Sequence, residues 1–441
     1  MITFKQALSL TRDEVYDISY RHLNPLRLEN MNLPYFVRAD NQYLWDEEGS
    51  KYLDMATSIG VQGIGNCNDS AREALITILE EKVPGIQAAA LHPFAAAFAK
   101  NLSELSPGSL NHVWFGNCGT EAVEAAIKIV NLAKRNDPSK KRIVSCLNAF
   151  HGRTVGSLSL MGEKSWNIYN QKKIENHTYI PFNDLNALEK ELKKGDVIAF
   201  FVEPIQGEAG VIVPDDDYLP GVRALCDKYD ALLVCDEIQT GFGRTGKLWA
   251  FENWGIVPDA CTFAKGFSAG YVPIGGVLVT DELWDAAYGS ENTFFLHTNT
   301  YMEGSMACGS ALISLEQLVS NDWIKNNAIK GSKIIDSLNS LKDKYPHLIK
   351  AVRGKGLLIA IEYCANEDKV PASVPDEYKG GYFTGKIDTL LLKKYHVIGR
   401  KAGTKPRMRF LPPFCITDND IEYFIQSLDK VLAEISNEIN D

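Results

Sequence analysis

The sequence predicts an α/β protein built on a mostly parallel sheet. Short apolar runs occupy residues 197–202, 231–235 and 259–264. Each run is too short for a typical helix and indicates a buried strand of a parallel sheet. The last two runs stop at Asp236 and at Lys265, 29 positions apart. Because ligands of open α/β sheets lie just beyond the carboxyl ends of the strands, we expect these two side chains in one crevice.

Composition narrows the class of function. The 441 residues include 46 Lys and Arg against 56 Asp and Glu, for a formal net charge of −10, and 45% of them are apolar. Without a basic block, neither nucleic acid nor an acidic membrane surface is an expected partner. The length suits two or three domains with a large core. We therefore expect a soluble protein that acts on small molecules.

The cysteines and the N-terminus give no sign of an oxidising compartment. Nine cysteines are scattered along the chain, and none forms a Cys-x-x-Cys pair. Neither a disulfide framework nor a zinc site is indicated, so no metal is expected. The first residues lack the apolar core of a signal peptide, and no stretch is long and apolar enough to span a bilayer. The expected location is cytoplasmic.

Several elements are expected outside the crevice. Residues 11–21 have a helical pattern, and residues 34–55 alternate like a small antiparallel meander. Residues 352–362 indicate one strand, and an amphipathic helix is expected from Asp418 onward.

A strand, a turn and a helix are predicted over residues 113–133. An apolar stripe at helical spacing places the start of the helix near Gly119 and Thr120. The unpaired amides and the dipole of such a terminus attract a phosphate, and the Thr120 hydroxyl could add a bond. An ordinary capped turn is the other interpretation of this segment alone.

The two side chains at the crevice suggest a particular cofactor. An amine that can form an imine, facing a carboxylate that can bond a protonated ring nitrogen, is what pyridoxal phosphate (PLP) requires. Residues 232–276 resemble the signature of the class III, or ω-amino-acid, aminotransferases, a branch of the fold-type I PLP enzymes. The resemblance runs from about Tyr43 to about Thr417, with the motifs in the family's order. Among its members the chain resembles ornithine, GABA and putrescine aminotransferases.

The resemblance implies a two-domain fold and a homodimer with shared active sites. The large α/β domain, residues 60–310, would contain a mostly parallel seven-stranded sheet. Residues 1–59 and 311–441 would form a smaller α+β domain from both ends of the chain.

The resemblance also implies roles for the residues around the cofactor. Asp236 would hold the pyridine nitrogen protonated, and Lys265 would bind the cofactor and then shuttle the substrate proton. Phe150 and Ile238 would face the ring from opposite sides, and Gln239 would donate a hydrogen bond to the phenolic oxygen.

The phosphate would be shared between two subunits. Gly119 and Thr120 would bind it from the helix terminus, and Thr300 would reach the phosphate of the other subunit.

Substrate carboxylates are expected at arginines. Arg153 resembles the arginine that receives a substrate carboxylate in ornithine and GABA aminotransferases, and a planar guanidinium suits that task. Glu208 and Arg409 resemble the ion pair that opens for dicarboxylates. For Arg153, the alternative is a surface arginine with a local acid partner. For Glu208 and Arg409, the alternative is a purely structural salt bridge. A glycosidase-like pair or a metal site at Glu203 and Glu208 is disfavoured because no second acid pair or His set follows.

Two segments depart from the family pattern. Residues 65–69 carry Asn66 where the family usually has Gly-His-x-His-Pro, and residues 302–305 read Met-Glu-Gly-Ser instead of Gly-Gly-Asn-Pro. Residues 297–300, His-Thr-Asn-Thr, look more like those of putrescine-type members. Both departures affect the expected substrate pocket rather than the cofactor chemistry.

The predicted reaction is a two-stage amino transfer. An amine donor, expected to be an amino acid or diamine with a terminal amine, leaves its nitrogen on the cofactor. A 2-oxo acid such as 2-oxoglutarate or pyruvate then takes it. An isomerase of the same cofactor (aminomutase or epimerase) and a decarboxylating transaminase stay open, and a non-catalytic protein on this fold is disfavoured. A nicotinamide enzyme is disfavoured too, because the glycines of residues 241–246 do not join a strand to a helix.

Overall fold

The computed structural model describes residues 1–23, 34–86, 90–162, 174–293, 295–401 and 405–440. A seven-stranded sheet has the order β4-β10-β9-β8-β7-β5-β6. Strand β10 is antiparallel to both of its neighbours, and the remaining pairs are parallel. The mostly parallel seven-stranded sheet of the predicted fold class is therefore confirmed. Its strands are β4 (Leu110–Gly116), β5 (Arg142–Cys146), β6 (His177–Ile180), β7 (Val197–Val202), β8 (Leu232–Asp236), β9 (Ala260–Phe263) and β10 (Gly275–Thr280).

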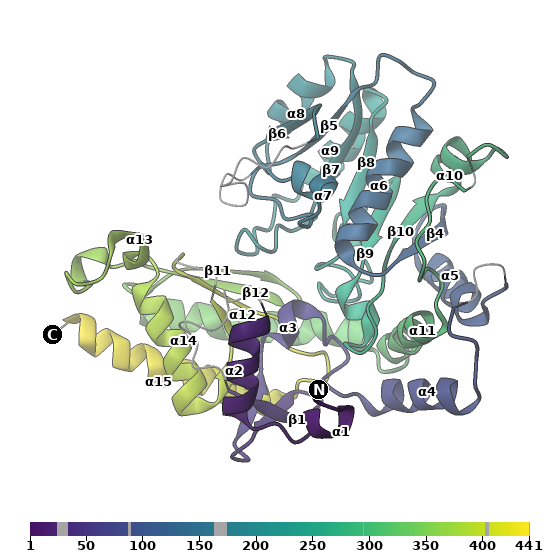
Figure 1. Ribbon diagram of the computed structural model, residues 1–441. Coiled ribbons are helices and arrows are strands. Elements are labelled where there is room, and N and C mark those ends of the chain that lie inside the picture. Colours follow the sequence, from purple (N-terminus) through teal and green to yellow (C-terminus); the bar gives the residue numbers. More distant parts are fainter. Residues whose placement is uncertain (24–33, 87–89, 163–173, 294, 402–404, 441) are drawn as a thin grey trace.

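Helices cover both faces of this sheet (Figure 1). Val234 and Val277 pack into one cluster with α6 and α10, whereas Leu233 and Cys235 pack into another that contains residues of α5, α8 and α9. Alternate residues of β8 thus point into opposite layers, which explains why its sequence is apolar throughout. The helices of this part are α4 (Asp69–Glu80), α5 (Pro93–Leu105), α6 (Gly119–Ala133), α7 (Val155–Ser159), α8 (Leu185–Leu192), α9 (Tyr218–Lys228), α10 (Asp281–Tyr288) and α11 (Ser305–Ser320), with the 3-10 helices η3 (Ala250–Trp254) and η4 (Lys265–Ser268).

Two four-stranded sheets form a second, smaller part. The first has the order β1-β2-β3-β13 and the second β11-β12-β15-β14. Strand β13 runs parallel to β3, so segments more than 340 residues apart share one sheet. The strands are β1 (Phe36–Asp40), β2 (Tyr43–Asp46), β3 (Lys51–Asp54), β11 (Ile349–Lys355), β12 (Leu358–Tyr363), β13 (Val397–Ile398), β14 (Arg400–Lys401) and β15 (Arg407–Phe410).

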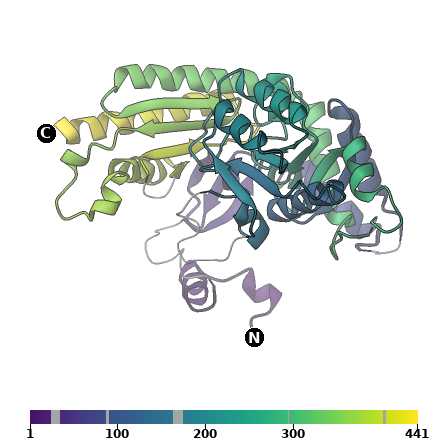
Figure 2. The same cartoon turned by 90° about the horizontal axis from the view of Figure 1, so that it is seen from above.

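Long helices accompany the small sheets. Figure 2 shows the yellow-green C-terminal elements lying to one side of the large sheet. Helices α1 and α2 bury none of their residues. The helices are α1 (Phe4–Ala7), α2 (Arg12–His22), α3 (Thr57–Gly60), α12 (Trp323–Lys344), α13 (Asp376–Lys379), α14 (Tyr382–Tyr395) and α15 (Asp418–Asn440), with the 3-10 helix η5 (Glu367–Lys369).

One expected strand is a hairpin instead. The prediction of a single strand over residues 352–362 is wrong, because β11 ends at Lys355 and β12 begins at Leu358, antiparallel to it. Gly356 between them has φ +55°, a conformation that side chains with a Cβ rarely adopt. The chain therefore reverses at this glycine. The predicted helices near the N- and C-termini and the antiparallel meander are confirmed by α2, α15 and β1–β3.

Candidate active site

A cavity of about 510 Å³ lies at the carboxyl ends of the parallel strands. The turns after β5, β7, β8 and β9 contribute to its wall, as does the first turn of α6. Its lining includes most of the predicted site residues: Gly119, Thr120, Phe150, Arg153, Glu208, Asp236, Ile238, Gln239 and Lys265. The sheet topology therefore brings together side chains that are spread over almost 150 positions of the sequence.

Lys265 lies two residues after the end of β9 and begins η4. Its φ of +48° belongs to the left-handed region, which turns the chain sharply at the strand end. Burial lowers the pKa of the Lys265 ammonium to about 8, with Arg409 acting in the same direction and Glu208, Asp236 and Glu203 opposing it. A substantial fraction of this amine is therefore neutral near pH 8.

Asp236 is the last residue of β8 and is only 4% exposed. Its Oδ1 accepts hydrogen bonds from the Ile238 amide and from the Thr262 hydroxyl, each at 3.1 Å. Thr262 lies directly opposite Asp236 on β9, so strand pairing itself fixes the carboxylate. Asp236 and Lys265 thus reach the same cavity from adjacent strands.

His151 holds the other oxygen of that carboxylate. The distance from His151 Nδ1 to Asp236 Oδ2 is 2.7 Å, and the histidine is 1% exposed. Burial opposes protonation of the ring, but the Asp236 carboxylate outweighs it and raises the pKa of His151. Nε2 of His151 is buried and has no hydrogen-bond partner among the described residues. The sequence motif around Phe150 contains His151, but no sequence signal paired this histidine with an aspartate 85 positions away.

The start of α6, where a phosphate is predicted to bind, lies at the cavity. Gly119 is the first residue of the helix, and Thr120 follows it into the cavity lining. The Thr120 hydroxyl lies 3.0 Å from the Thr154 hydroxyl and 2.8 Å from the Ser157 hydroxyl. A Cβ on Gly119 would come within 2.9 Å of the Ile238 side chain, so a larger residue would push against Ile238.

Two acidic residues near this helix terminus are bound to the protein rather than lining the cavity. Oε2 of Glu121 accepts from the amide and the side chain of Asn117 at 2.8 and 2.9 Å. Oε1 of Glu124 accepts from the Ser157 amide at 3.1 Å and from the Thr154 hydroxyl. These bonds direct both carboxylates toward neighbouring loops and leave the first amides of α6 to an anion.

Phe150, Ile238 and Gln239 all line the cavity, as the resemblance implies. Nε2 of Gln239 is buried with no hydrogen-bond partner among the described residues, while its Oε1 lies 3.4 Å from Nη1 of Arg409. A Cβ on Gly207 would lie 1.8 Å from that Oε1, so a larger residue at position 207 would displace the Gln239 side-chain amide. An unpaired buried amide donor in this cavity suits an oxygen of a bound molecule.

Glu208 and Arg409 form the predicted ion pair. Two nitrogens of the Arg409 guanidinium lie 2.7 and 2.8 Å from the two carboxylate oxygens of Glu208, and Arg409 is 1% exposed. Burial alone would raise the pKa of Glu208, but Arg409 outweighs it and the net pKa is lowered. Arg409 lies on β15 of the small sheet, so the pair connects the two parts of the molecule.

Of the predicted site residues Arg153 and Thr300, only Arg153 lines the cavity. Arg153 is exposed and lines the cavity, with its guanidinium carbon 5.9 Å from the centre of the Phe150 ring. Thr300 is also exposed but is not among the residues that line this cavity. Its predicted contact with the site of a second subunit stays a prediction.

The unusual Asn66 has a structural role. Its side-chain nitrogen donates to the Asn41 carbonyl and to Oδ2 of Asp54, both at 3.0 Å. Asn66 is buried and does not line the cavity. Ser305, in the second departure, donates through its hydroxyl to the Pro84 carbonyl at 2.7 Å. These two replacements thus stabilise loops within the chain.

The described part of the chain contains no group of three His, Cys, Asp or Glu side chains placed to hold a metal ion. In the same residues, no helix has the length and apolar character to cross a membrane. The donor set of the cavity instead fits PLP: an amine of lowered pKa, a buried carboxylate, an aromatic and an aliphatic face, an unpaired amide and a helix terminus.

Comparisons with known proteins agree with this chemistry. The chain is 39% identical over 440 residues, 99% of its length and 90% of the other's, to an uncharacterised aminotransferase of Schizosaccharomyces pombe. It is 34% identical to a putrescine aminotransferase of Pectobacterium atrosepticum, over 90% of this chain and 82% of that one.

Solved structures extend the agreement to the fold. An ornithine aminotransferase of Toxoplasma gondii matches with a TM-score of 0.87 and 26% identity over 99% of this chain and 98% of that one. An (S)-enantioselective ω-transaminase of Thermomicrobium roseum matches with a TM-score of 0.87 and 29% identity over 97% and 99% of the two chains. Both support the fold-type I architecture. Residues 27–432 match the family model described as aminotransferase class-III, so the chain belongs to the class III aminotransferases, which transfer amino groups with the help of PLP.

Proposed function

We propose that this aminotransferase takes the terminal amino group of a diamine or ω-amino acid and passes it to a 2-oxo acid such as 2-oxoglutarate or pyruvate. One observation supports the site most strongly. Adjacent strands deliver Lys265, with a lowered pKa, and the buried Asp236 to one cavity.

Bound PLP supplies an electron sink that stabilises negative charge on the substrate carbon next to the amine. We assign Lys265 as the residue that attaches PLP and then moves the proton at that carbon. Its pKa of about 8 leaves enough neutral amine for this role near neutral pH. Asp236 would bond the protonated ring nitrogen, and His151 holds that carboxylate in place through its hydrogen bond to Oδ2.

The remaining contacts hold the cofactor. We assign Phe150 and Ile238 to its two faces and Gln239 to its phenolic oxygen, which the unpaired amide nitrogen of Gln239 would satisfy. Gly119 and Thr120 would bind the phosphate at the start of α6.

The closed ion pair favours an amine donor without a second carboxylate. Both carboxylate oxygens of Glu208 bind the Arg409 guanidinium. Arg409 therefore cannot bind a donor's carboxylate while this ion pair is formed. The acceptor's carboxylate is received at Arg153, and a dicarboxylate acceptor such as 2-oxoglutarate also displaces Glu208 from Arg409. The similarity to a putrescine aminotransferase adds support for a diamine donor.

We also propose a homodimer in which Thr300 completes the phosphate site of the partner subunit. The proposal rests on the resemblance to the family; Tyr301, the residue after Thr300, is 63% exposed and is therefore accessible to a second subunit. Light scattering should give twice the mass of one chain, and a monomer would contradict this.

For the single chain, we propose a large domain of residues 60–310 and a small domain of residues 1–59 and 311–441, because β13 pairs with β3.

A half-reaction panel tests the proposed donor. The PLP-loaded protein is mixed with putrescine, ornithine, GABA and alanine without any 2-oxo acid, and loss of the cofactor's visible absorption is followed. We expect the diamine to react fastest and then stop until 2-oxoglutarate or pyruvate is added. Steady product formation without an acceptor would instead favour an isomerase, and carbon dioxide release would favour a decarboxylating transaminase.

A further inference from the structure

Glu203, the residue after β7, lines the cavity but has no role in the reaction described above. It is 6% exposed. Its Oε2 accepts a hydrogen bond from the Phe150 amide at 3.0 Å, and its Oε1 accepts one from the Gly207 amide at 3.3 Å. One carboxylate therefore connects the loop of the ring-facing Phe150 to the loop that carries Glu208.

The titratable groups around Glu203 come from several elements. Burial raises the pKa of Glu203 to about 7, with the charge of Asp236 acting in the same direction and that of His151 opposing it. Glu203 in turn is one of the acids that raise the pKa of Lys265, and it also raises the pKa of the Cys146 thiol. The carboxylate is thus electrostatically linked to both key groups of the reaction, Asp236 and Lys265.

We propose that Glu203 is a positioning residue for amino transfer: it fixes the loops of Phe150 and Glu208, and its negative charge acts on Lys265 and on the Asp236–His151 pair. This proposal rests on the assignment of Lys265 as the residue that attaches PLP. Two consequences follow, one geometric and one electrostatic, and they can be measured separately.

The geometric consequence concerns cofactor binding. A carboxylate accepts from both amides, whereas the side chain of Gln can accept from only one and presents an NH₂ group to the other. In Glu203→Gln the Phe150 or the Gly207 amide loses its acceptor inside a buried site. We expect the dissociation constant of PLP from the protein to rise about tenfold, the size of effect typical of one lost hydrogen bond.

The electrostatic consequence concerns the proton on Lys265. Above about pH 7, the pKa to which burial raises Glu203, its carboxylate is negative, and removal of a negative charge near a cation lowers the pKa of the cation. The pH midpoint of the visible absorption band of PLP attached to Lys265 should therefore fall in Glu203→Gln, by about 0.5 pH unit, or roughly threefold in proton affinity. A purely structural role of Glu203 would weaken PLP binding without moving this midpoint.

Glu237→Gln is the matched control. Glu237 is 1% exposed, and burial also raises its pKa to about 7. Its oxygens bind the Thr240 hydroxyl and the Phe251 amide, and it does not line the cavity. It is not among the charges with the largest effect on the pKa of Lys265. This control should leave both the absorption midpoint and the PLP dissociation constant at their parent values.

Glu203→Asp separates charge from geometry. The shorter side chain keeps the charge but cannot span both amides, so we expect a parent-like absorption midpoint with weaker PLP binding. The inference is overturned if the midpoint of Glu203→Gln equals that of the parent, or if Glu237→Gln shifts it equally. Where Glu203→Gln does not fold, unchanged PLP affinity in Glu203→Asp overturns the inference. Failure of the underlying assignment would look different, because the parent itself would then lack PLP at Lys265.

Discussion

At the scale of single residues, the proposed chemistry depends on Lys265. Lys265→Ala removes the proposed attachment point and proton carrier while trimming a side chain that lines the cavity. We expect steady-state turnover to fall by about 10³-fold or more, with an unchanged circular dichroism spectrum. Turnover close to that of the parent would show that another group carries the proton.

The second residue-scale prediction concerns the Glu208–Arg409 pair. In Glu208→Gln the bidentate ion pair is replaced by a weaker neutral contact, so Arg409 accepts a dicarboxylate more readily. We expect the KM for 2-oxoglutarate to fall about threefold to tenfold, while pyruvate, with one carboxylate, changes little. Steady-state kinetics with both acceptors and a fixed diamine donor measure this, and an equal change for both acceptors would contradict it.

Lys265 and Asp236 could be located from sequence because each lies at or just beyond the end of a recognisable buried strand. His151 and Glu203 could not be given roles in the same way. Their contacts to Asp236 and Phe150 span 85 and 53 positions and exist only when separate loops meet. Arg409 was found through the family resemblance, since its isolated sequence context gives no reason to pair it with Glu208.

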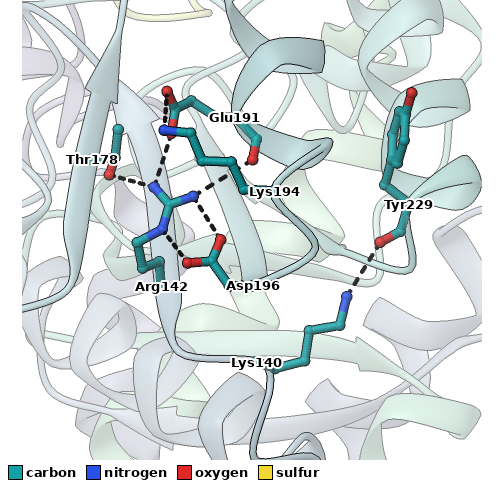
Figure 3. A network of polar contacts seen from close by, with 7 residues as sticks. All are labelled: Lys140, Arg142, Thr178, Glu191, Lys194, Asp196 and Tyr229. Atoms are coloured by element: carbon teal, nitrogen blue, oxygen red, sulfur yellow. Dashed lines mark hydrogen bonds and ion pairs between the residues drawn. The ribbon is translucent and has the colours of Figure 1, made fainter.

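At the scale of elements, an ion-pair network secures the edge of the large sheet (Figure 3). Arg142 at the start of β5 makes two contacts of 2.7 Å to Asp196, one of 2.9 Å to Glu191 in α8 and one of 2.6 Å to the Thr178 hydroxyl in β6. The Asp196 carboxylate and that of Glu191 raise the pKa of Arg142 against the effect of partial burial. The guanidinium thus joins β5 to its sheet neighbour β6, to α8 and to the residue that precedes β7.

Arg142→Ala tests this network. Loss of the shared cation leaves two partly buried carboxylates near each other, so we expect stability to fall by about 1–3 kcal/mol and the melting temperature to drop by a few degrees. Lys228→Ala is the control, because Lys228 is 58% exposed in its contact with Glu189. Differential scanning fluorimetry compares the two, and equal melting temperatures would contradict a stabilising role for Arg142.

The elements that the sequence misses are those with weak patterns. Strand β6 has only four residues, at the edge of the sheet, and β10 begins with two glycines, so neither gives a strong strand signal. The hairpin of β11 and β12 was missed because residues 353–356, Arg-Gly-Lys-Gly, contain no Asn-Gly or Asp-Gly turn signal and are followed at once by an apolar run. Apolar runs that end at charged residues, by contrast, predicted β7, β8 and β9 well.

At the scale of the whole molecule, buried carboxyl groups make stability depend on pH. Burial raises the pKa of Glu237 from 4.5 to about 7. Between these values the folded protein holds a proton that the unfolded chain has released, so stability falls as pH rises. The stabilisation that comes from the protonated, buried Glu237 carboxyl is fully present below about pH 4.5 and is lost as the pH rises through about 7.

Glu237→Gln removes this dependence. Relative to the variant, the parent should lose stability between pH 5 and pH 7.5, with a slope of up to about 1.4 kcal/mol per pH unit. Melting temperatures at both pH values measure the difference. Glu189→Gln is the control, because hydrogen bonds from Lys228 and Lys193 hold the pKa of Glu189 near 2, well below this range. A constant difference between the parent and Glu237→Gln would contradict a titration of Glu237 in this window.

The central claim is that this class III aminotransferase carries PLP on Lys265, opposite Asp236. The most direct test is to reduce the PLP-loaded protein with borohydride, digest it and locate the pyridoxyl group by mass spectrometry, with Lys265→Ala treated in parallel. The account predicts one labelled lysine, Lys265, in the parent and no label in the variant. A label on another lysine, or none on a parent protein saturated with PLP, would contradict it.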